Sequence, residues 1–230
     1  MKAIKRSQDR GRGDHGWLSS HHTFSFGDYY DPDNMGFGSL RVINEDRVAP
    51  GMGFGTHPHN NMEVFSYVIE GELAHKDSMG NGRTIRAGEL QAMSAGTGVT
   101  HSEFNPSSEA PVHFLQIWIV PNERNLSPSY AEWNPTSGER SPLTLVVSPD
   151  AREESLKVHQ NVEIYFGSLT GPEKILFPIA KGKRVWLQTI KGELKVGEEA
   201  LRSGDAMSFV DEEGLEVATD SNAEFMLFHL

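Results

Sequence analysis

Short apolar runs separated by turn-forming residues constrain this chain more than any other feature. Each run is rich in Val, Ile, Phe, Tyr and Trp, and clusters of Gly, Asn, Asp and Pro lie between the runs. Such runs are typical of β-strands, and the sequence lacks the long amphipathic pattern of helices. The pattern predicts an all-β sandwich or barrel. The six clearest runs are Glu63–Glu70, His113–Val120, Leu143–Val147, Val162–Leu169, Arg184–Ile190 and Glu224–Leu230.

The two halves of the chain resemble each other. The segment "YVIEGEL", Tyr67–Leu73, matches "QTIKGEL", Gln188–Leu194, at an offset of 121 residues. The segment "RAGEL", Arg86–Leu90, matches "RSGDA", Arg202–Ala206, at an offset of 116 residues. Two matches in the same order and at similar spacing indicate a duplicated β domain. The polar, Pro-rich segment Pro121–Pro142 is the natural linker between the copies.

Length, charge and composition narrow the class of protein. The chain has 230 residues, which is enough for one large or two small β domains. Its net charge of −11 argues against direct binding to nucleic acid. It has no cysteine, which excludes disulfides and thiolate metal sites and fits a cytoplasmic location. We expect neither a secretory signal nor a membrane segment, because no apolar run has the required position and length.

Two pairs of potential metal ligands are each spaced two residues apart. His57 and His59 flank Pro58, which fixes φ between them, and His101 and Glu103 follow a glycine-rich turn. Residues two apart on an extended chain point to the same face. On neighbouring strands, the two pairs would place three imidazoles and a carboxylate around one point. Those donors suit Fe(II), Mn, Ni, Cu or Zn.

These residues also match known motifs. The segment "HPHNNMEVFSYVIEG" resembles the first cupin motif, and "GELQAMSAGTGVTHSEFN" resembles the second, with two additional residues between its first two motif glycines. The segments "HGWLSSHHTFSFGDYYDPDNMGFGSLRVINED" and "VSPDAREESLKVHQN" are similar to the bacterial pirin family. The resemblance extends from about residue 10 to the C-terminus.

The resemblance implies a bicupin, which consists of two β-barrel (double-stranded β-helix) domains in tandem. We expect a metal-binding domain over residues 1–125, a linker over 126–142 and a domain without metal over 143–230. The family implies one divalent metal ion per chain, with Fe(II) expected and Mn, Ni, Cu or Zn as alternatives. The implied ligands are His57, His59, His101 and Glu103.

The repeat offset supports a metal site in one half alone. With the offset of 121 residues, His57, His59 and Glu63 fall on Pro178, Ala180 and Arg184, none of which is a good ligand. Glu63 occupies the usual ligand position of the broader cupin motif. The resemblance to pirins implies that Glu63 lies in the pocket or beside the ligands and does not bind the metal itself. Glu63 and Glu103 are the two candidates for the general base.

The resemblance implies an enzyme that cleaves flavonols such as quercetin, consuming O2 and releasing CO. An alternative is a pirin-type regulatory protein that binds a transcription factor or a metabolic enzyme, with iron as a structural or redox element. A third possibility is a metal-assisted isomerase of the sugar or keto-acid kind. The expected partners are a small aromatic substrate and O2, with a protein partner under the regulatory hypothesis. Two barrels that cover each other's faces suggest a monomer.

The remaining histidines and large aromatic residues are interpreted as structural. His15, His21 and His22 lie among aromatic residues near the N-terminus. His75, His113, His159 and His229 have no histidine or glutamate two residues away to form a pair like the two above. Phe114, Trp118 and Trp186 lie within predicted strands and are expected in the hydrophobic core.

Overall fold

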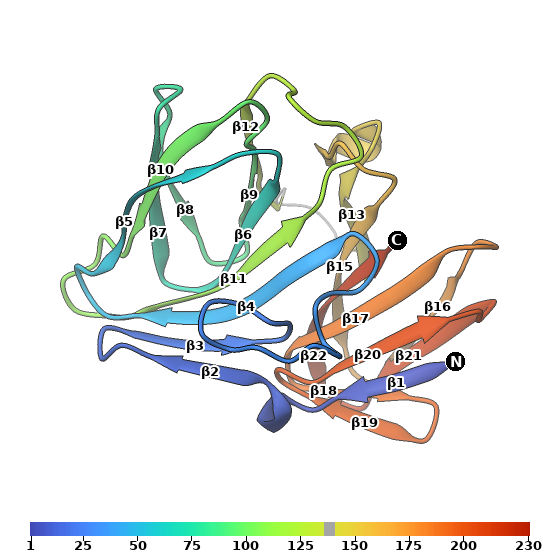
Figure 1. Cartoon of the computed structure of the whole chain (residues 1–230). Coiled ribbons are helices and arrows are strands. Elements are labelled where there is room, and N and C mark those ends of the chain that lie inside the picture. Colours follow the sequence, from blue (N-terminus) through green and yellow to red (C-terminus); the bar gives the residue numbers. More distant parts are fainter. Residues whose placement is uncertain (136–140) are drawn as a thin grey trace. The chain divides into compact units, whose positions relative to one another are not determined.

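The computed structural model describes residues 1–135 and 141–230 and is built almost entirely of β-strands (Figure 1). Its helical segments in this part of the chain are two single 3-10 turns, Ser7–Asp9 and Arg152–Glu154. None of the described helices is long and apolar enough to cross a membrane. The prediction of an all-β protein is therefore confirmed.

The described residues form two compact units. The N-terminal unit contains residues 11–135 and 158–160, and the C-terminal unit contains residues 1–10, 141–157 and 161–230. The predicted duplication is thus present, but the boundaries differ from those expected at residues 125 and 143. Strand β12 (Ser129–Trp133) lies within the expected linker, and β1 (Lys2–Lys5) belongs to the C-terminal unit.

The N-terminal unit has two antiparallel sheets. Within the described residues, the larger sheet has the strand order β12-β9-β6-β11-β4-β3-β2, and the smaller has the order β5-β10-β7-β8. The strands other than β12 are β2 (Gly11–Asp14), β3 (Leu18–His22), β4 (Leu40–Val48), β5 (Gly53–His59), β6 (Glu63–Glu70), β7 (Glu72–Asp77), β8 (Gly82–Arg86), β9 (Leu90–Ser94), β10 (Val99–Phe104) and β11 (Val112–Ile119).

The C-terminal unit repeats this plan. In the described chain its larger sheet has the order β1-β20-β17-β22-β15-β13-β14, and its smaller sheet has the order β16-β21-β18-β19. The strands after β1 are β13 (Leu143–Ser148), β14 (Leu156–Lys157), β15 (Glu163–Thr170), β16 (Glu173–Pro178), β17 (Arg184–Lys191), β18 (Glu193–Val196), β19 (Glu199–Arg202), β20 (Ala206–Val210), β21 (Gly214–Thr219) and β22 (Asn222–His229).

Strand register confirms that the halves are structural copies. Tyr67 of β6 pairs with Leu90 of β9, and Gln188 of β17 pairs with Ala206 of β20. These pairs are related by the same two offsets that relate the sequence matches. The turns between β6 and β7 and between β17 and β18, each of which joins the larger sheet to the smaller one, contain Gly71 and Gly192, both at positive φ. A side chain at either glycine would be strained in that conformation.

The edge strands next to β9 and β20 explain the shifted boundaries. In the N-terminal unit β9 pairs with β12, which directly precedes the undescribed residues 136–140. In the C-terminal unit the equivalent strand β20 pairs with β1, from the opposite end of the chain. Without a neighbour, β9 and β20 would each expose a row of unpaired backbone N–H and C=O groups at the edge of the sheet. Strands β12 and β1, from different parts of the chain, pair with these groups.

The interiors of both units contain many buried apolar residues. A large apolar cluster in the C-terminal unit includes Phe209, Phe225 and Leu187, all fully buried. In the N-terminal unit one apolar cluster includes Phe114 and another includes Val64, and further apolar side chains are buried outside these two. Several buried polar residues belong to the N-terminal unit, and they form the site described next.

Candidate metal centre and adjoining cavity

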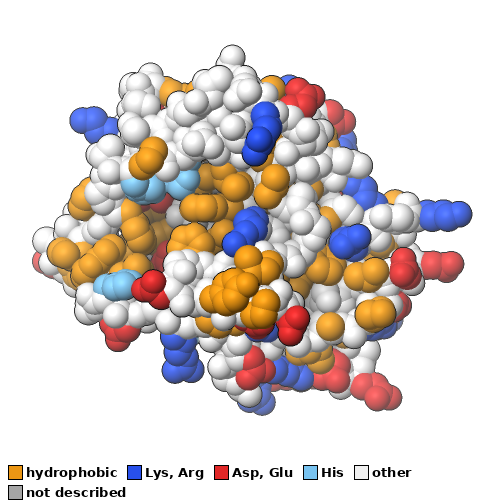
Figure 2. Space-filling view, viewed as in Figure 1, with side chains coloured by type: hydrophobic (Ala, Val, Ile, Leu, Met, Phe, Trp, Pro, Cys, Tyr) orange, Lys and Arg blue, Asp and Glu red, His pale blue; other side chains and the backbone are white. Residues whose placement is uncertain are grey.

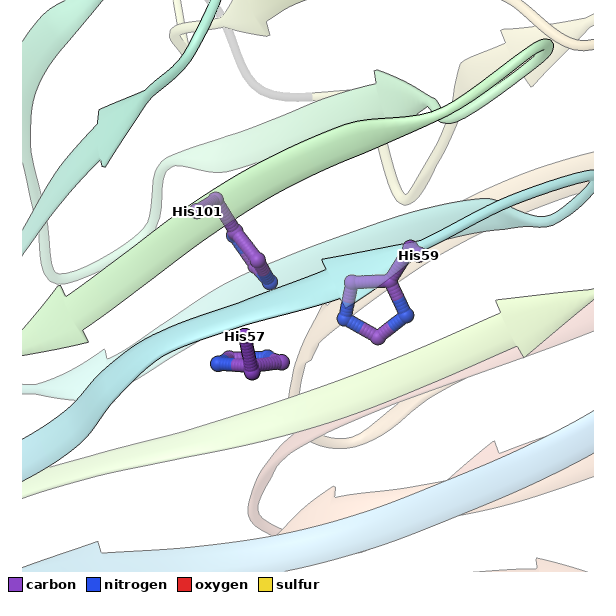
Figure 3. Close-up of side chains that lie close together, drawn as sticks. All are labelled: His57, His59 and His101. Atoms are coloured by element: carbon purple, nitrogen blue, oxygen red, sulfur yellow. The ribbon is translucent and has the colours of Figure 1, made fainter.

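Three histidines from two neighbouring strands converge in the N-terminal unit (Figure 3). Strands β5 and β10 are antiparallel, and their register places His101 opposite His57 and Val99 opposite His59. The centroids of the three imidazole rings lie 4.5 to 4.9 Å apart. One nitrogen from each ring lies within 4.8 Å of the other two, which is close enough for all three to contact a single ion.

Local strand geometry produces this convergence. Burial alternates along β10, so that His101 and Glu103 face inward while Thr100 and Phe104 are exposed. A β-bulge lies in the β5–β10 pairing, where the register shifts between His101 and Glu103. Such a bulge re-aims side chains and is common beside active sites.

The hydrogen bonds of the histidines suit a metal ion. The buried Nε2 atom of His101 has no hydrogen-bond partner in the described structure. The carbonyl oxygen of Gly55 lies 2.8 Å from Nδ1 of His57 and accepts a hydrogen bond from the N–H at that nitrogen. The Nε2 lone pair of His57 is then free, as in most metal-binding histidines whose other nitrogen donates to a carbonyl. The residues present therefore fit a bound divalent ion.

The electrostatics of the cluster favour neutral imidazoles. Burial lowers the pKa of His59 to about 4, with a further contribution from His57. Burial, together with the neighbouring His57, His59 and His75, lowers the pKa of His101 to about 3. Both rings are neutral near neutral pH, and a neutral ring has one nitrogen lone pair that can bind a metal without first releasing a proton.

Glu103 lies next to His101 and not within the group of three histidines. It belongs to a second group with His75 and His101, whose potential ligand atoms also lie within 4.8 Å of one another. Its Oε1 accepts hydrogen bonds from Ser66 (2.7 Å) and Gln91 (2.8 Å), and its Oε2 accepts one from Gln116 (3.1 Å). Burial raises the pKa of Glu103 to about 7, although Ser66 and Gln91 oppose the shift.

Glu63 belongs to neither group of potential metal ligands. Glu63 is buried, and its Oε1 accepts a hydrogen bond from Ser94 Oγ (2.8 Å) and lies 3.3 Å from Nδ1 of His159. Glu63 is not among the residues that line the cavity beside the histidines. Its role as a general base remains a prediction.

A cavity of about 680 Å³ opens beside His57 and His59. In Figure 2, histidine side chains are visible in a hollow of the surface among hydrophobic side chains. The cavity volume lies in the range of small-molecule sites. The lining residues are Arg12, Gly13, Asp14, His15, Trp17, Leu18, Ser20, His22, Phe26, Gly27, Asp28, Tyr29, Asn44, Asp46, Phe54, His57, His59, Gln116 and Trp118.

Aromatic rings form much of the cavity wall. Trp118 packs edge-on against His59 at 5.0 Å and against Phe26 at 5.4 Å between ring centroids. Trp118 packs against the apolar cluster around Val64, as expected of a core residue, and it also lines the cavity, as do His15 and His22. The strand pattern indicates which face a residue occupies, but not whether that face also adjoins a cavity.

The other large aromatic residues and the remaining histidines fit the interpretation better. Phe114 and Trp186 are buried, as expected of core residues. His21 does not line the cavity. His113 pairs with Glu45 at 2.9 Å and His229 with Glu163 at 3.1 Å, so each ring has a carboxylate partner within the fold.

Asp46 was missed by sequence reasoning. It lines the cavity from β4, and its carboxyl group accepts a hydrogen bond from Ser20. Burial raises the pKa of Asp46 to about 7, against the opposing effect of the Ser20 hydrogen bond. The available signal was the pair Asn44 and Asp46, two polar residues two apart in a strand whose other face also carries charged residues.

Strand pairing identifies the equivalent positions in the C-terminal unit. Ala74 pairs with Phe104, and 121 residues later Lys195 pairs with Ala218. From these anchors, β10 corresponds to β21 and β5 to β16. The residues equivalent to His57, His59, His101 and Glu103 are Phe177, Ile179, Leu215 and Val217.

All four equivalent residues are buried and apolar. The predicted equivalents of His57 and His59, Pro178 and Ala180, are each one residue too far along the chain. The bulge adds one residue to β5 relative to β16, and a constant offset cannot account for it. Both groups of potential ligands found among the described residues lie in the N-terminal unit.

The duplicated fold and the histidines on two adjacent strands define a two-domain cupin protein with a candidate metal centre in one domain. Comparison with known proteins agrees. Residues 4–119 match the Pirin family model, and residues 145–230 match the model of the quercetinase C-terminal cupin domain. The chain belongs to the pirin family.

Individual relatives cover the whole chain. The quercetin 2,3-dioxygenase of Escherichia coli K12 is 46% identical over 232 residues, covering 100% of this chain and 99% of the relative. A pirin-like protein of Caulobacter vibrioides is 36% identical over 220 residues, covering 94% of each chain. The crystal structure of the E. coli bacterial pirin YhhW in complex with nickel(II) is 46% identical, covers 100% of this chain and 99% of that chain, and has a TM-score of 0.95.

Proposed function

We propose that this protein is a metal-dependent dioxygenase that cleaves flavonols such as quercetin, consuming O2 and releasing CO. The observation that carries the proposal is the aromatic-walled cavity that His57 and His59 line. A full-length relative at 46% identity is named a quercetin 2,3-dioxygenase, which supports the same chemistry. The regulatory alternative requires no such cavity next to the metal centre.

The proposed metal ligands are His57, His59 and His101, with Glu103 completing the set. The convergence of the three rings and the unpartnered Nε2 of His101 support this assignment. The position of Glu103 beside His101 supports its inclusion. We expect Fe(II) as the native ion, and the nickel complex of YhhW illustrates that a relative accepts another divalent ion.

When bound, the ion supplies Lewis acidity for a deprotonated hydroxyl oxygen and a centre for O2 chemistry. The protein binds and orients the substrate. Trp118 and Phe26 present ring surfaces to a flat aromatic molecule, and Trp17 packs against Phe54 at 5.3 Å on the same cavity. Rigid aromatic walls restrict a planar substrate to few orientations and exclude water from its ring system.

Asp46 is the proposed proton acceptor. Its carboxyl group faces the cavity that contains the two histidines, whereas Glu63 does not line that cavity. A pKa of about 7 gives a large carboxylate fraction at neutral pH together with useful basicity. Asp46 would accept the proton of the enolic hydroxyl of the flavonol, and Ser20 would hold the carboxyl group in place through its hydrogen bond.

The test is O2 uptake by protein loaded separately with Fe(II), Mn(II), Ni(II), Cu(II) and Zn(II), in the presence of a panel of flavonols. We expect flavonol loss that requires both metal and O2, with CO trapped by ferrous myoglobin in equal amount to the O2 consumed. Metal-free protein and an anaerobic sample are the controls. A fully loaded protein that consumes no flavonol with any of these ions would contradict the proposal and turn attention to the regulatory alternative, tested by capture of bound proteins.

A further inference from the structure

A chain of three buried side chains, Asp77, His75 and His101, leads to the candidate metal centre, and neither Asp77 nor His75 lines the cavity. Nδ1 of His101 lies 3.4 Å from Nδ1 of His75, and Nε2 of His75 lies 3.1 Å from Oδ2 of Asp77. The side chains of His75 and Asp77 are fully buried. Tyr130 stacks on the His75 ring at 4.7 Å between centroids and fixes its plane. Neither His75 nor Asp77 has a role in the function proposed above.

The hydrogen bonds of Asp77 fix its orientation. Its Oδ1 accepts from the backbone N–H groups of Met79 (2.9 Å) and Asn81 (3.0 Å). Its Oδ2 accepts from the side-chain amide of Asn81 (2.8 Å) and faces His75. Every one of these contacts is an acceptor contact, so Asp77 presents an acceptor, not a donor, to His75.

The position of each proton along the chain follows from this arrangement. Because Asp77 accepts, Nε2 of His75 must carry a proton and donate it. The neutral His75 ring then has a lone pair on Nδ1, which can only accept. Nδ1 of His101 must therefore carry a proton and donate it to His75. In the neutral His101 ring the remaining lone pair lies on Nε2, the atom without a hydrogen-bond partner.

We propose that Asp77 and His75 are positioning residues that hold His101 in the tautomer whose Nε2 lone pair is available to the metal ion. This inference rests on the proposed metal site. A partner that accepts the second N–H of a ligand histidine fixes both the tautomer and the ring orientation. At the position equivalent to His75, the C-terminal unit has Val196, a buried apolar residue of its core cluster. The chain of polar groups thus accompanies the histidine cluster and is absent where the described equivalents of that cluster are apolar.

Asp77→Asn is the sharpest test, because the backbone determines how the new amide must lie. The N–H groups of Met79 and Asn81 require an oxygen at the Oδ1 position, so the amide nitrogen takes the position of Oδ2, and the side-chain amide of Asn81, which donates to Oδ2 in the wild type, must turn its oxygen toward the new nitrogen. It would then donate to Nε2 of His75 and reverse both tautomers in the chain. Nε2 of His101 would carry the proton and could no longer bind a metal.

Two measurements follow, and neither uses a flavonol. In the metal-free wild-type protein, nitrogen-15 NMR should detect the proton of His101 on Nδ1, and in the Asp77→Asn variant on Nε2. Affinity for Ni²⁺, measured by competition with a chromophoric chelator, should fall about 10- to 100-fold in the variant. Failure of the proposed function alone would leave both results intact.

A matched control is available in the His113–Glu45 pair, which has the same chemistry and does not contact His101. Glu45→Gln should leave the affinity for Ni²⁺ and the tautomer of His101 unchanged. His75→Asn keeps an acceptor near Nδ1 of His101, and it should retain more affinity than His75→Leu, which keeps none. A wild-type His101 protonated on Nε2, or an Asp77→Asn variant with wild-type affinity, would overturn the proposal.

Discussion

The two units of this chain share strand order and register and differ in what fills the equivalent positions. Where the N-terminal unit has His57, His101 and Glu103, the C-terminal unit has Phe177, Leu215 and Val217. The difference extends across the larger sheet. Ser66, Gln91 and Gln116 form a hydrogen-bonded row in the N-terminal unit, and the equivalent residues are Leu187, Met207 and Leu227.

This comparison separates what the fold requires from what the site requires. The strand pairing accepts either a polar or an apolar row, so the β fold itself does not depend on the histidines. A buried polar row is costly unless its members satisfy one another, and Ser66, Gln91 and Gln116 all donate toward Glu103. At positions where the C-terminal unit has apolar core residues, the N-terminal unit therefore has a polar network. Each member of this network depends on the others for its hydrogen bonds.

The largest expected effect comes from converting the first unit toward the second. His101→Leu introduces the residue found at the equivalent position 215. We expect loss of stoichiometric metal and of flavonol cleavage together, since His57, His59 and Glu103 alone leave a looser site. The fold should remain intact, because leucine removes the unpartnered Nε2 and only one internal hydrogen bond, from Nδ1 to His75. Metal analysis and thermal unfolding check both points, and one ion per chain in the variant would contradict the assignment.

The second effect concerns the proton acceptor. Asp46→Asn should lower the rate of flavonol cleavage about 10²- to 10⁴-fold, the contribution of a positioned proton-transfer group, with metal content unchanged. Asp46 must be ionised to accept a proton, and burial raises its pKa to about 7. The wild-type kcat/KM should therefore rise with pH through about 7, and the variant should lose this rise. A variant with wild-type rate and pH profile would remove Asp46 from the mechanism.

A smaller effect, on stability alone, is expected in the second unit. Leu215→Ala removes buried apolar contacts and should cost about 2–5 kcal/mol of unfolding free energy. Metal content and activity of the folded protein should not change, because the residue has no ligand role. Denaturant unfolding followed by metal analysis makes this the counterpart of His101→Leu. Loss of metal from a variant that remains folded would show that the two units are not functionally distinct.

The smallest effect is expected for Glu63→Gln. Glu63 contacts Ser94 and His159 and does not line the cavity. We expect full metal content and a rate loss far below that of Asp46→Asn. Steady-state kinetics on metal-analysed samples provide the check, and a loss of 10²-fold or more would restore Glu63 as a proton-transfer group.

Much of the architecture could be predicted from the sequence because its signals are local. The apolar runs, the turn glycines and the two short matches between the halves of the sequence were enough to predict two β domains. The spacing of His57, His59 and His101 indicated a ligand group, and the structure brings those three together. Their ligand role, with Glu103, remains a prediction.

What the sequence could not predict depends on contacts between distant residues. The pairing of β1 with β20 joins residues about 200 positions apart, so it left no local signal. The bulge in β5 shifted the repeat offset by one residue at His57. Asp46 reaches the cavity because β4 lies between β3 and β11, and His159 meets Glu63 from 96 residues away. The order of the strands in each sheet determines such contacts, and the hydrophobic periodicity of a single strand does not reveal that order.

The central claim is that one ion per chain binds at the histidines of the N-terminal unit. A crystal of the metal-loaded protein, measured at the absorption edge of its metal, tests this directly. We predict a single anomalous peak per chain, about 2.0–2.3 Å from nitrogens of His57, His59 and His101. A strong peak among Phe177, Ile179 and Leu215, or a peak bound mainly by His15 or His22, would contradict it.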